Sequence, residues 1–187
     1  MRTLITGETW GDNVDSVRAY LLREAEQPFG VLRPKLGATW REFGASLERV
    51  SDAQAQFIPA SGEGEDAWGI AEVLRHVASI QPIMEQRVRL LGTGQSADGI
   101  ARTHSGYLAH VDTRRITDLL AALDQSYADL VDAIATIDGR ERLDTLAAHR
   151  RFGELNCRGW IAMHTLHLQD HARQIGRIKR MNGYPAG

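Results

Sequence analysis

Long stretches of this chain repeat their apolar residues at intervals of three and four positions, which is the spacing of one face of an α-helix. No stretch alternates apolar and polar residues over enough positions to form a sheet. The periodic stretches cover residues 36–50, 68–91, 113–137 and 155–181. The pattern therefore predicts an all-α protein, a four-helix bundle with long crossover connections.

A shorter periodic segment precedes this predicted bundle. Val14, Val17 and Leu21 recur at helical spacing, and Pro28 with Gly30 ends the segment. We therefore expect a short helix before the bundle. The predicted division of the chain is an N-terminal extension with this helix, a helical bundle domain and a C-terminal tail, at residues 1–33, 34–181 and 182–187.

Three histidines lie on one face of the last predicted helix. His164, His167 and His171 recur at helical spacing and share their stripe with Trp160 and Ile175, so they face the interior of a bundle. Neutral imidazole is a good ligand for zinc, nickel or iron, and two histidines four positions apart present two nitrogens to one ion. We therefore expect a metal site whose third ligand comes from elsewhere in the chain.

Histidines also occur inside proteins without a metal. A single histidine on an apolar face is usually a core residue whose ring is hydrogen-bonded to a carbonyl group. Three imidazoles without a common partner would leave several ring nitrogens unsatisfied, each at a cost of about 1–3 kcal/mol. The spacing favours a shared ligand, and an ordinary helical interaction domain with buried histidines stays open as the alternative.

The second predicted helix brings a further histidine toward the interior. His76 follows Val73 by three positions and precedes Ile80 by four, so it projects from the apolar stripe or its edge. Glu72, one turn before His76, is a candidate partner of the site or a candidate catalytic base. A surface carboxylate near a helix N-terminus is the competing interpretation of Glu72.

The remaining histidines fall in predicted connections. His104 and His110 lie with Tyr107 in the glycine-rich connection 92–112, which is long enough to act as a lid. His149 lies in a polar link before the last helix, and we expect it to be solvated.

The charge balance, the cysteine content and the lack of long apolar stretches indicate the class of protein. The chain has 22 Lys and Arg against 24 Asp and Glu, and no basic block stands out, which disfavours a nucleic-acid partner. Cys157 is the single cysteine and cannot form an internal disulfide, and we expect it to be a packed, inert thiol. No stretch resembles a signal peptide or approaches the roughly 20 apolar residues of a membrane span. We expect a soluble, cytoplasmic protein with no membrane partner.

Two motifs on the second and last predicted helices resemble those of a known family. WGIAEVLRH, residues 68–76, is similar to W-[ST]-[IV]-x-E-[VIL]-L-x-H, and HLQDHARQI, residues 167–175, is similar to H-x-x-x-H-x-x-Q-I. Both are motifs of the DinB-like (DinB/YfiT) metal-binding four-helix bundle proteins, and the resemblance extends from about Pro34 to Arg180. The departure is Gly69, where that family usually has Ser or Thr.

The resemblance implies a function for the histidines. His76, His167 and His171 would ligate one divalent metal, which is zinc, nickel or iron in that family, and His164 would be a neighbour of the site. A three-histidine site leaves a coordination position open, as catalytic metals require. The resemblance favours a thiol S-transferase that uses mycothiol, bacillithiol or glutathione, or a related hydrolase, in detoxification or stress response.

The competing hypothesis is a metal site without catalysis. In that case the ion ties the second and last helices together, or serves as a sensor. In either case we expect a homodimer, because bundles of this kind bury apolar faces by pairing. The expected partner of an enzyme of this kind is a small-molecule substrate.

Overall fold

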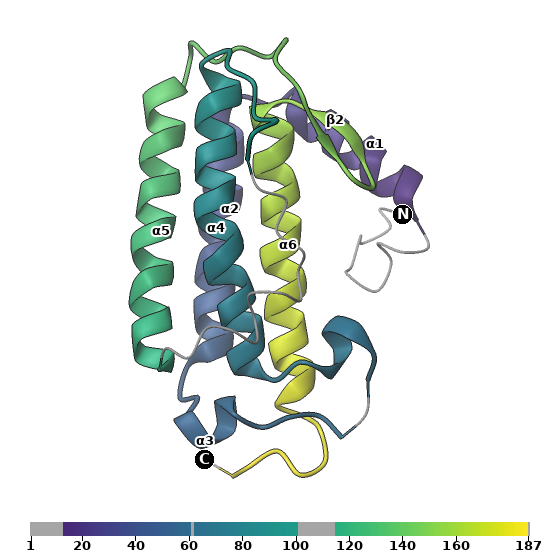
Figure 1. The fold of residues 1–187 in the computed structure, drawn as a ribbon, viewed down its shortest axis with the longest axis vertical. Helices are drawn as coiled ribbons and strands as arrows, with labels where there is room; N and C mark the ends of the chain where they lie inside the picture. Colours follow the sequence, from purple (N-terminus) through teal and green to yellow (C-terminus); the bar gives the residue numbers. More distant parts are fainter. Residues whose placement is uncertain (1–12, 61, 101–114, 187) are drawn as a thin grey trace.

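The structure, a computed structural model, describes residues 13–60, 62–100 and 115–186. The α-helices are α1 (Val14–Ala25), α2 (Phe29–Leu47), α3 (Asp52–Ala55), α4 (Ile70–Gly92), α5 (Ile116–Ile137) and α6 (Cys157–Ile178), η2 (Gly64–Ala67) is a 3-10 helix, and the strands are β1 (Ala147–His149) and β2 (Gly153–Leu155). The long helices α2, α4, α5 and α6 run side by side along the molecule (Figure 1). The predicted four-helix bundle is therefore confirmed.

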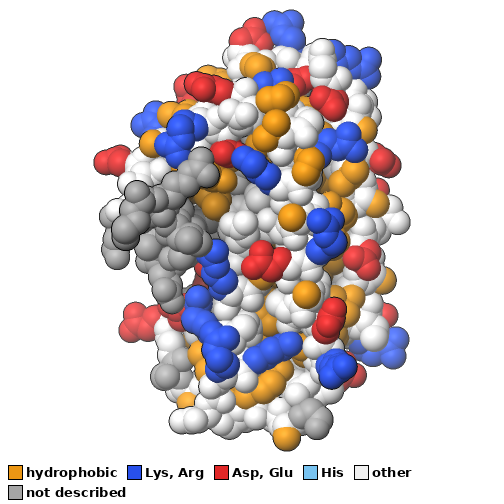
Figure 2. All heavy atoms as spheres, turned by 180° about the vertical axis from the view of Figure 1, so that it is seen from behind, with side chains coloured by type: hydrophobic (Ala, Val, Ile, Leu, Met, Phe, Trp, Pro, Cys, Tyr) orange, Lys and Arg blue, Asp and Glu red, His pale blue; other side chains and the backbone are white. Residues whose placement is uncertain are grey.

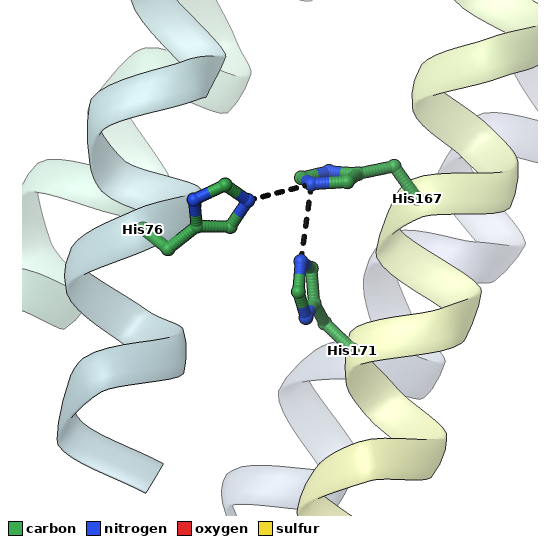
Figure 3. A group of neighbouring side chains, drawn as sticks. All are labelled: His76, His167 and His171. Carbon is green, nitrogen blue, oxygen red and sulfur yellow. Dashed lines mark hydrogen bonds between the residues drawn. The ribbon is translucent and has the colours of Figure 1, made fainter. Parts of the chain in front are cut away.

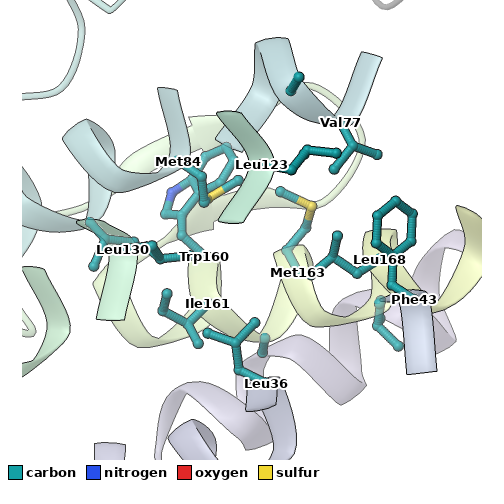
Figure 4. Packing of buried hydrophobic residues seen from close by; sticks show 14 of the residues in the cluster. Leu36, Phe43, Val77, Met84, Leu123, Leu130, Trp160, Ile161, Met163 and Leu168 are labelled. Atoms are coloured by element: carbon teal, nitrogen blue, oxygen red, sulfur yellow. The ribbon is translucent and has the colours of Figure 1, made fainter. Parts of the chain in front are cut away.

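Helix α6 is central to the packing of the bundle. It packs against α2, α4 and α1, while α5 packs against the other side of α4. Helices α4 and α6 run in opposite directions (Figure 1). Buried side chains from all four long helices interlock between them (Figure 4), among them Leu36, Phe43, Val77, Met84, Leu123, Leu130, Ile161 and Leu168. Burial of each such side chain contributes about 1.5–3 kcal/mol, which fixes α4 and α6 against each other.

Helix α2 begins at Phe29 and not near residue 36, and the predicted domain boundary between residues 33 and 34 falls inside it. Phe29 and Leu32 continue the buried stripe of Leu36, which extends the apolar face of the helix toward the N-terminus. Pro34 is exposed in the second turn, where its missing N–H removes a single intrahelical hydrogen bond. The preceding helix α1 ends at Ala25, before Pro28, as predicted.

The other long helices begin and end close to the predicted positions. Helix α4 extends through Pro82 to Gly92, and α5 ends at Ile137, followed by Asp138 and Gly139. The connection between α4 and α5 includes residues 101–114, so His104, Tyr107 and His110 lie outside the described residues.

A small antiparallel hairpin corrects the expectation of a chain without sheet. Strands β1 and β2 pair with Ala147 opposite Leu155 and with His149 opposite Gly153. Each strand has three residues, which is too short for a period of two to stand out in the sequence.

The expectation that His149 is solvated is also wrong. Its ring stacks on Phe152 with 4.6 Å between the ring centroids, and its Nδ1 accepts the backbone N–H groups of Arg151 and Phe152 at 3.2 and 3.3 Å. Burial, and then the neighbouring arginines led by Arg87, lower the pKa of His149 to about 4. His149 therefore stabilises the hairpin turn as a neutral, half-buried ring.

The surface carries charge of both signs. On the face seen in Figure 2, Lys and Arg side chains are interspersed with Asp and Glu side chains, in keeping with the formal net charge of −2. Within the described ranges, no helix combines the length and the apolar character that a membrane span requires.

Candidate metal centre

Three histidine rings from two helices meet inside the bundle. His76 projects from α4, and His167 and His171 project from α6 toward it (Figure 3). The Nε2 atom of His167 lies 2.8 Å from Nε2 of His76 and 3.0 Å from Nε2 of His171. One nitrogen from each ring lies within 4.8 Å of the other two. These are the residues to which the family resemblance assigns the metal, and their role as ligands stays a prediction.

Side chains cap the N-termini of α4 and α6, the two helices that carry these rings. The side chain of Glu72 accepts the N–H of Gly69 at 2.8 Å, which fixes the first turn of α4 just before His76. At the start of α6, Asn156 accepts the N–H of Gly159 at 2.9 Å. The interior side of each helix is apolar, so the packing that buries these stripes also turns the histidines toward one another.

Two of the three histidines, His76 and His171, are buried, and His167 is half-buried. His76 is 4% exposed and His171 is 1% exposed. Burial lowers the pKa of His167 well below the ordinary histidine value, and the neighbouring His171 and His76 lower it further. Burial is also the main cause of the lowered pKa of His171. His167 and His171 are therefore neutral near pH 7, as metal ligation requires.

Hydrogen bonding alone does not account for the way the rings meet. An imidazole nitrogen has a single proton or a single lone pair in the ring plane, so Nε2 of His167 makes one linear hydrogen bond. It nevertheless faces two other Nε2 atoms. Two ligands about 2.05 Å from a tetrahedral zinc ion lie about 3.3 Å apart, close to the observed separations. A set of three converging imidazoles thus fits a divalent zinc, nickel or iron ion.

An aromatic ring covers the histidines on one side. The ring centroid of Trp68, which immediately precedes α4, lies 5.1 Å from that of His76 and 6.5 Å from that of His171. Trp68 is itself 5% exposed. It therefore shields two of the rings from water. Trp68, the tryptophan of the first motif, thus lies at the candidate site.

Glu72 has a structural role where it stands. Its carboxylate completes a capping box at the N-terminus of α4, which agrees with the interpretation of Glu72 as a helix-terminal carboxylate. Its role as a catalytic base stays a prediction.

His164 lies beside the three rings without joining their convergence. It is fully buried, and its ring centroid is 6.0 Å from that of His167. Neither of its ring nitrogens has a hydrogen-bond partner among the described residues. Burial lowers the pKa of His164 to about 4, so the ring is neutral.

Cys157 begins α6 and is fully buried. Burial, and then the nearby carboxylate of Glu141, raise the pKa of the thiol to about 11, which agrees with the predicted inert thiol.

Gln174, the glutamine of the second motif, has no role predicted from the sequence, and the structure places it in direct contact with the site. Its Oε1 atom lies 2.8 Å from Nδ1 of His171. The signal in the sequence is its position three residues after His171, on the same face of the helix. A polar residue in a buried stripe beside a candidate ligand is a candidate for orienting that ligand.

Comparisons with known proteins agree with this architecture. The sequence pattern of the DinB superfamily matches residues 35–175. No curated protein matches the chain. Among solved structures, the chain is similar to one described as "TT2238, a four-helix bundle protein", with a TM-score of 0.52 and 20% sequence identity. The match covers 81% of this chain and 98% of that chain, and at this identity it concerns the fold alone.

Proposed function

The chain belongs to the DinB superfamily, and from this we propose that it is a metal-dependent enzyme in which His76, His167 and His171 hold one divalent ion. The observation that carries the proposal is the convergence of their Nε2 atoms, with separations of 2.8 and 3.0 Å, between α4 and α6. Three protein ligands leave a coordination position for a substrate, which distinguishes a catalytic site from a closed structural one.

Zinc and nickel are the ions that we propose first, with iron as a further candidate, because all three accept neutral imidazole. When bound, such an ion would supply Lewis acidity, which lowers the pKa of a thiol or polarises a carbonyl group. The residues of the chain would hold the ion in place and exclude water from it. His167 and His171, which lie one helical turn apart on α6, would hold their Nε2 atoms 3.0 Å apart, and Trp68 would exclude water from one side.

The proposed reaction is the transfer of a low-molecular-weight thiol to a small electrophile, in detoxification or stress response. The thiol would be of the mycothiol, bacillithiol or glutathione type. Its sulfur would form a bond to the electrophilic carbon, and the leaving group would depart with the electron pair of the broken bond. Hydrolysis of an ester or amide is the related alternative. Support for both comes from family membership and from the open position that three ligands leave.

A non-catalytic metal site is the second candidate, and the burial of the histidines favours it. His76 and His171 are almost inaccessible in the described part of the chain, and Trp68 covers both. An ion held there would cross-link α4 to α6 and stabilise the bundle, with a structural or sensing role.

Two measurements on His167→Ala separate these candidates. Zinc-loaded and nickel-loaded wild type would be assayed with each of the three thiols and an aryl halide, and with a nitrophenyl ester. The enzyme proposal expects turnover that His167→Ala abolishes and that the control His149→Ala retains. The structural alternative expects no turnover, and a rise in melting temperature on addition of zinc that His167→Ala loses and His149→Ala keeps.

A further inference from the structure

The Gln174 side chain connects the candidate metal centre to a separate segment of the chain. Gln174 is 5% exposed on α6. Its Oε1 lies 2.8 Å from Nδ1 of His171, and its Nε2 donates a hydrogen bond to the backbone carbonyl of Glu65 in η2. The two ends of one amide group thus contact the site and the 3-10 helix.

These contacts determine which nitrogen of His171 carries its proton. The carbonyl oxygen of Glu65 can only accept, so the NH₂ end of the Gln174 amide must face it. The oxygen end therefore faces His171 and can only accept from Nδ1–H. A neutral imidazole with its proton on Nδ1 has its lone pair on Nε2, the atom that faces His167. His171 is thereby fixed in the tautomer that ligates a metal through Nε2.

Other contacts attach the same segment to the site. Trp68, which follows η2 directly, lies over the rings of His76 and His171. An exposed carboxylate of η2, that of Asp66, lies 3.9 Å from the guanidinium of Arg177 on α6, a weak ion pair at this distance and exposure. Residues 62–68 therefore lie against the end of the candidate site through polar and aromatic contacts.

We propose that Gln174 is a positioning residue that holds the His171 tautomer for metal binding and couples that binding to the order of residues 62–68. The inference rests on the proposed metal site. Coupling of this kind is reciprocal: a metal that fixes His171 strengthens the amide bridge to Glu65, and an ordered segment favours metal binding. Removal of a group that hydrogen-bonds to the second nitrogen of a ligating histidine typically lowers metal affinity by about 10–100-fold.

Two substitutions at position 174 distinguish the contact with His171 from the contact with Glu65. Gln174→Leu removes both contacts at similar volume. Gln174→Glu keeps an oxygen that accepts from His171 and loses the N–H that donates to Glu65. The control is Gln169→Leu, on the same helix, because the Gln169 amide donates to Thr39 on α2 at 3.3 Å, away from the histidines.

The experiment measures two quantities in the full-length protein and in each variant. One is the dissociation constant for Zn²⁺ and for Co²⁺, by competition with a chromophoric chelator. The other is amide hydrogen exchange of residues 62–68 with and without Zn²⁺. Nitrogen NMR of the wild type reports the His171 tautomer directly, and the expected form has its proton on Nδ1.

The proposal expects a distinct outcome for each variant. Gln174→Leu should weaken Zn²⁺ binding about 10–100-fold and abolish the slowing of exchange by zinc. Gln174→Glu should bind Zn²⁺ at least as tightly as wild type, yet lose the slowing of exchange in residues 62–68. Gln169→Leu should match wild type in both measurements.

Other outcomes would overturn the proposal. Wild-type affinity in Gln174→Leu would refute the positioning role while leaving the three-histidine site intact. Full protection of residues 62–68 in Gln174→Glu would refute the coupling. A wild type that binds no metal would instead refute the proposed function on which the inference rests, so the two failures are distinguishable.

Discussion

The Nε2 atoms of His76 and His167 lie 2.8 Å apart, although 91 positions separate the two residues in the sequence. The contact exists because α4 and α6 run in opposite directions and pack through apolar stripes that include these histidines. An ion shared by the two rings would join the second and last long helices of the bundle. Its effects should therefore be visible in fluorescence and stability as well as in activity.

The indole of Trp68 should report metal binding. Its ring centroid lies 5.1 Å from that of His76, and ions with partly filled d shells quench indole emission at such short range. Titration with Ni²⁺ should quench wild-type fluorescence, and Trp68→Phe should lose most of the quenched component. The control is Trp40→Phe, because Trp40 stacks on Tyr127 at 4.5 Å in another part of the core. Quenching that survives in Trp68→Phe would contradict the placement of the ion.

Buried His164 should make the metal-free protein sensitive to acid. Burial lowers its pKa from 6.5 to about 4, so below pH 6.5 the unfolded chain binds a proton that the folded state excludes. The stability contributed by the neutral ring is present above pH 6.5 and is lost as the pH falls toward 4. At about 1.4 kcal/mol per pH unit, wild type should lose about 2 kcal/mol more than His164→Leu between pH 7 and pH 5. Urea unfolding with a chelator present measures the difference, and equal losses would show that the His164 ring is not held neutral.

Gly69→Ser should destabilise the protein, although serine is a better N-cap residue than most. A Cβ atom at position 69 would lie 2.4 Å from the carbonyl oxygen of Phe57, a backbone atom that cannot rotate away. The clash should outweigh the cap and cost about 1–3 kcal/mol in the free energy of unfolding. At Gly44, in contrast, an added Cβ meets no atom within 4 Å, so Gly44→Ala should be neutral or stabilising. A higher melting temperature for Gly69→Ser would contradict the close approach of the two segments.

The clash also explains why this chain departs from the family motif at Gly69. The sequence alone presents the glycine as a weaker helix start. The structure shows that the backbone carbonyl of Phe57, just after α3, occupies the space of a side chain, while Glu72 supplies the cap from within the helix.

The long helices could be predicted because each buries a continuous stripe that repeats over many turns. The stripe beginning at Phe29 shows the limit of that reasoning, since Pro34 suggests a helix start that tertiary packing overrides. The β1–β2 hairpin could not be predicted from periodicity, because its strands are shorter than the pattern that identifies a strand.

The candidate site could be predicted in part. Spacing places His167 and His171 on one face of a helix, whereas the pairing of His76 with them came from the family motifs. The contact between Gln174 and Glu65 spans 109 positions and ends on a backbone carbonyl, which no side-chain pattern records.

The most direct test of the metal centre is the metal content of purified protein, measured by mass spectrometry after loading with zinc or nickel and removal of free ion. Wild type and the control His149→Ala should each hold about one equivalent, and the double variant His76→Ala, His167→Ala should hold none while circular dichroism shows that it stays helical. Wild type without metal, or a double variant that still holds a full equivalent, would contradict the assignment of His76, His167 and His171 as ligands.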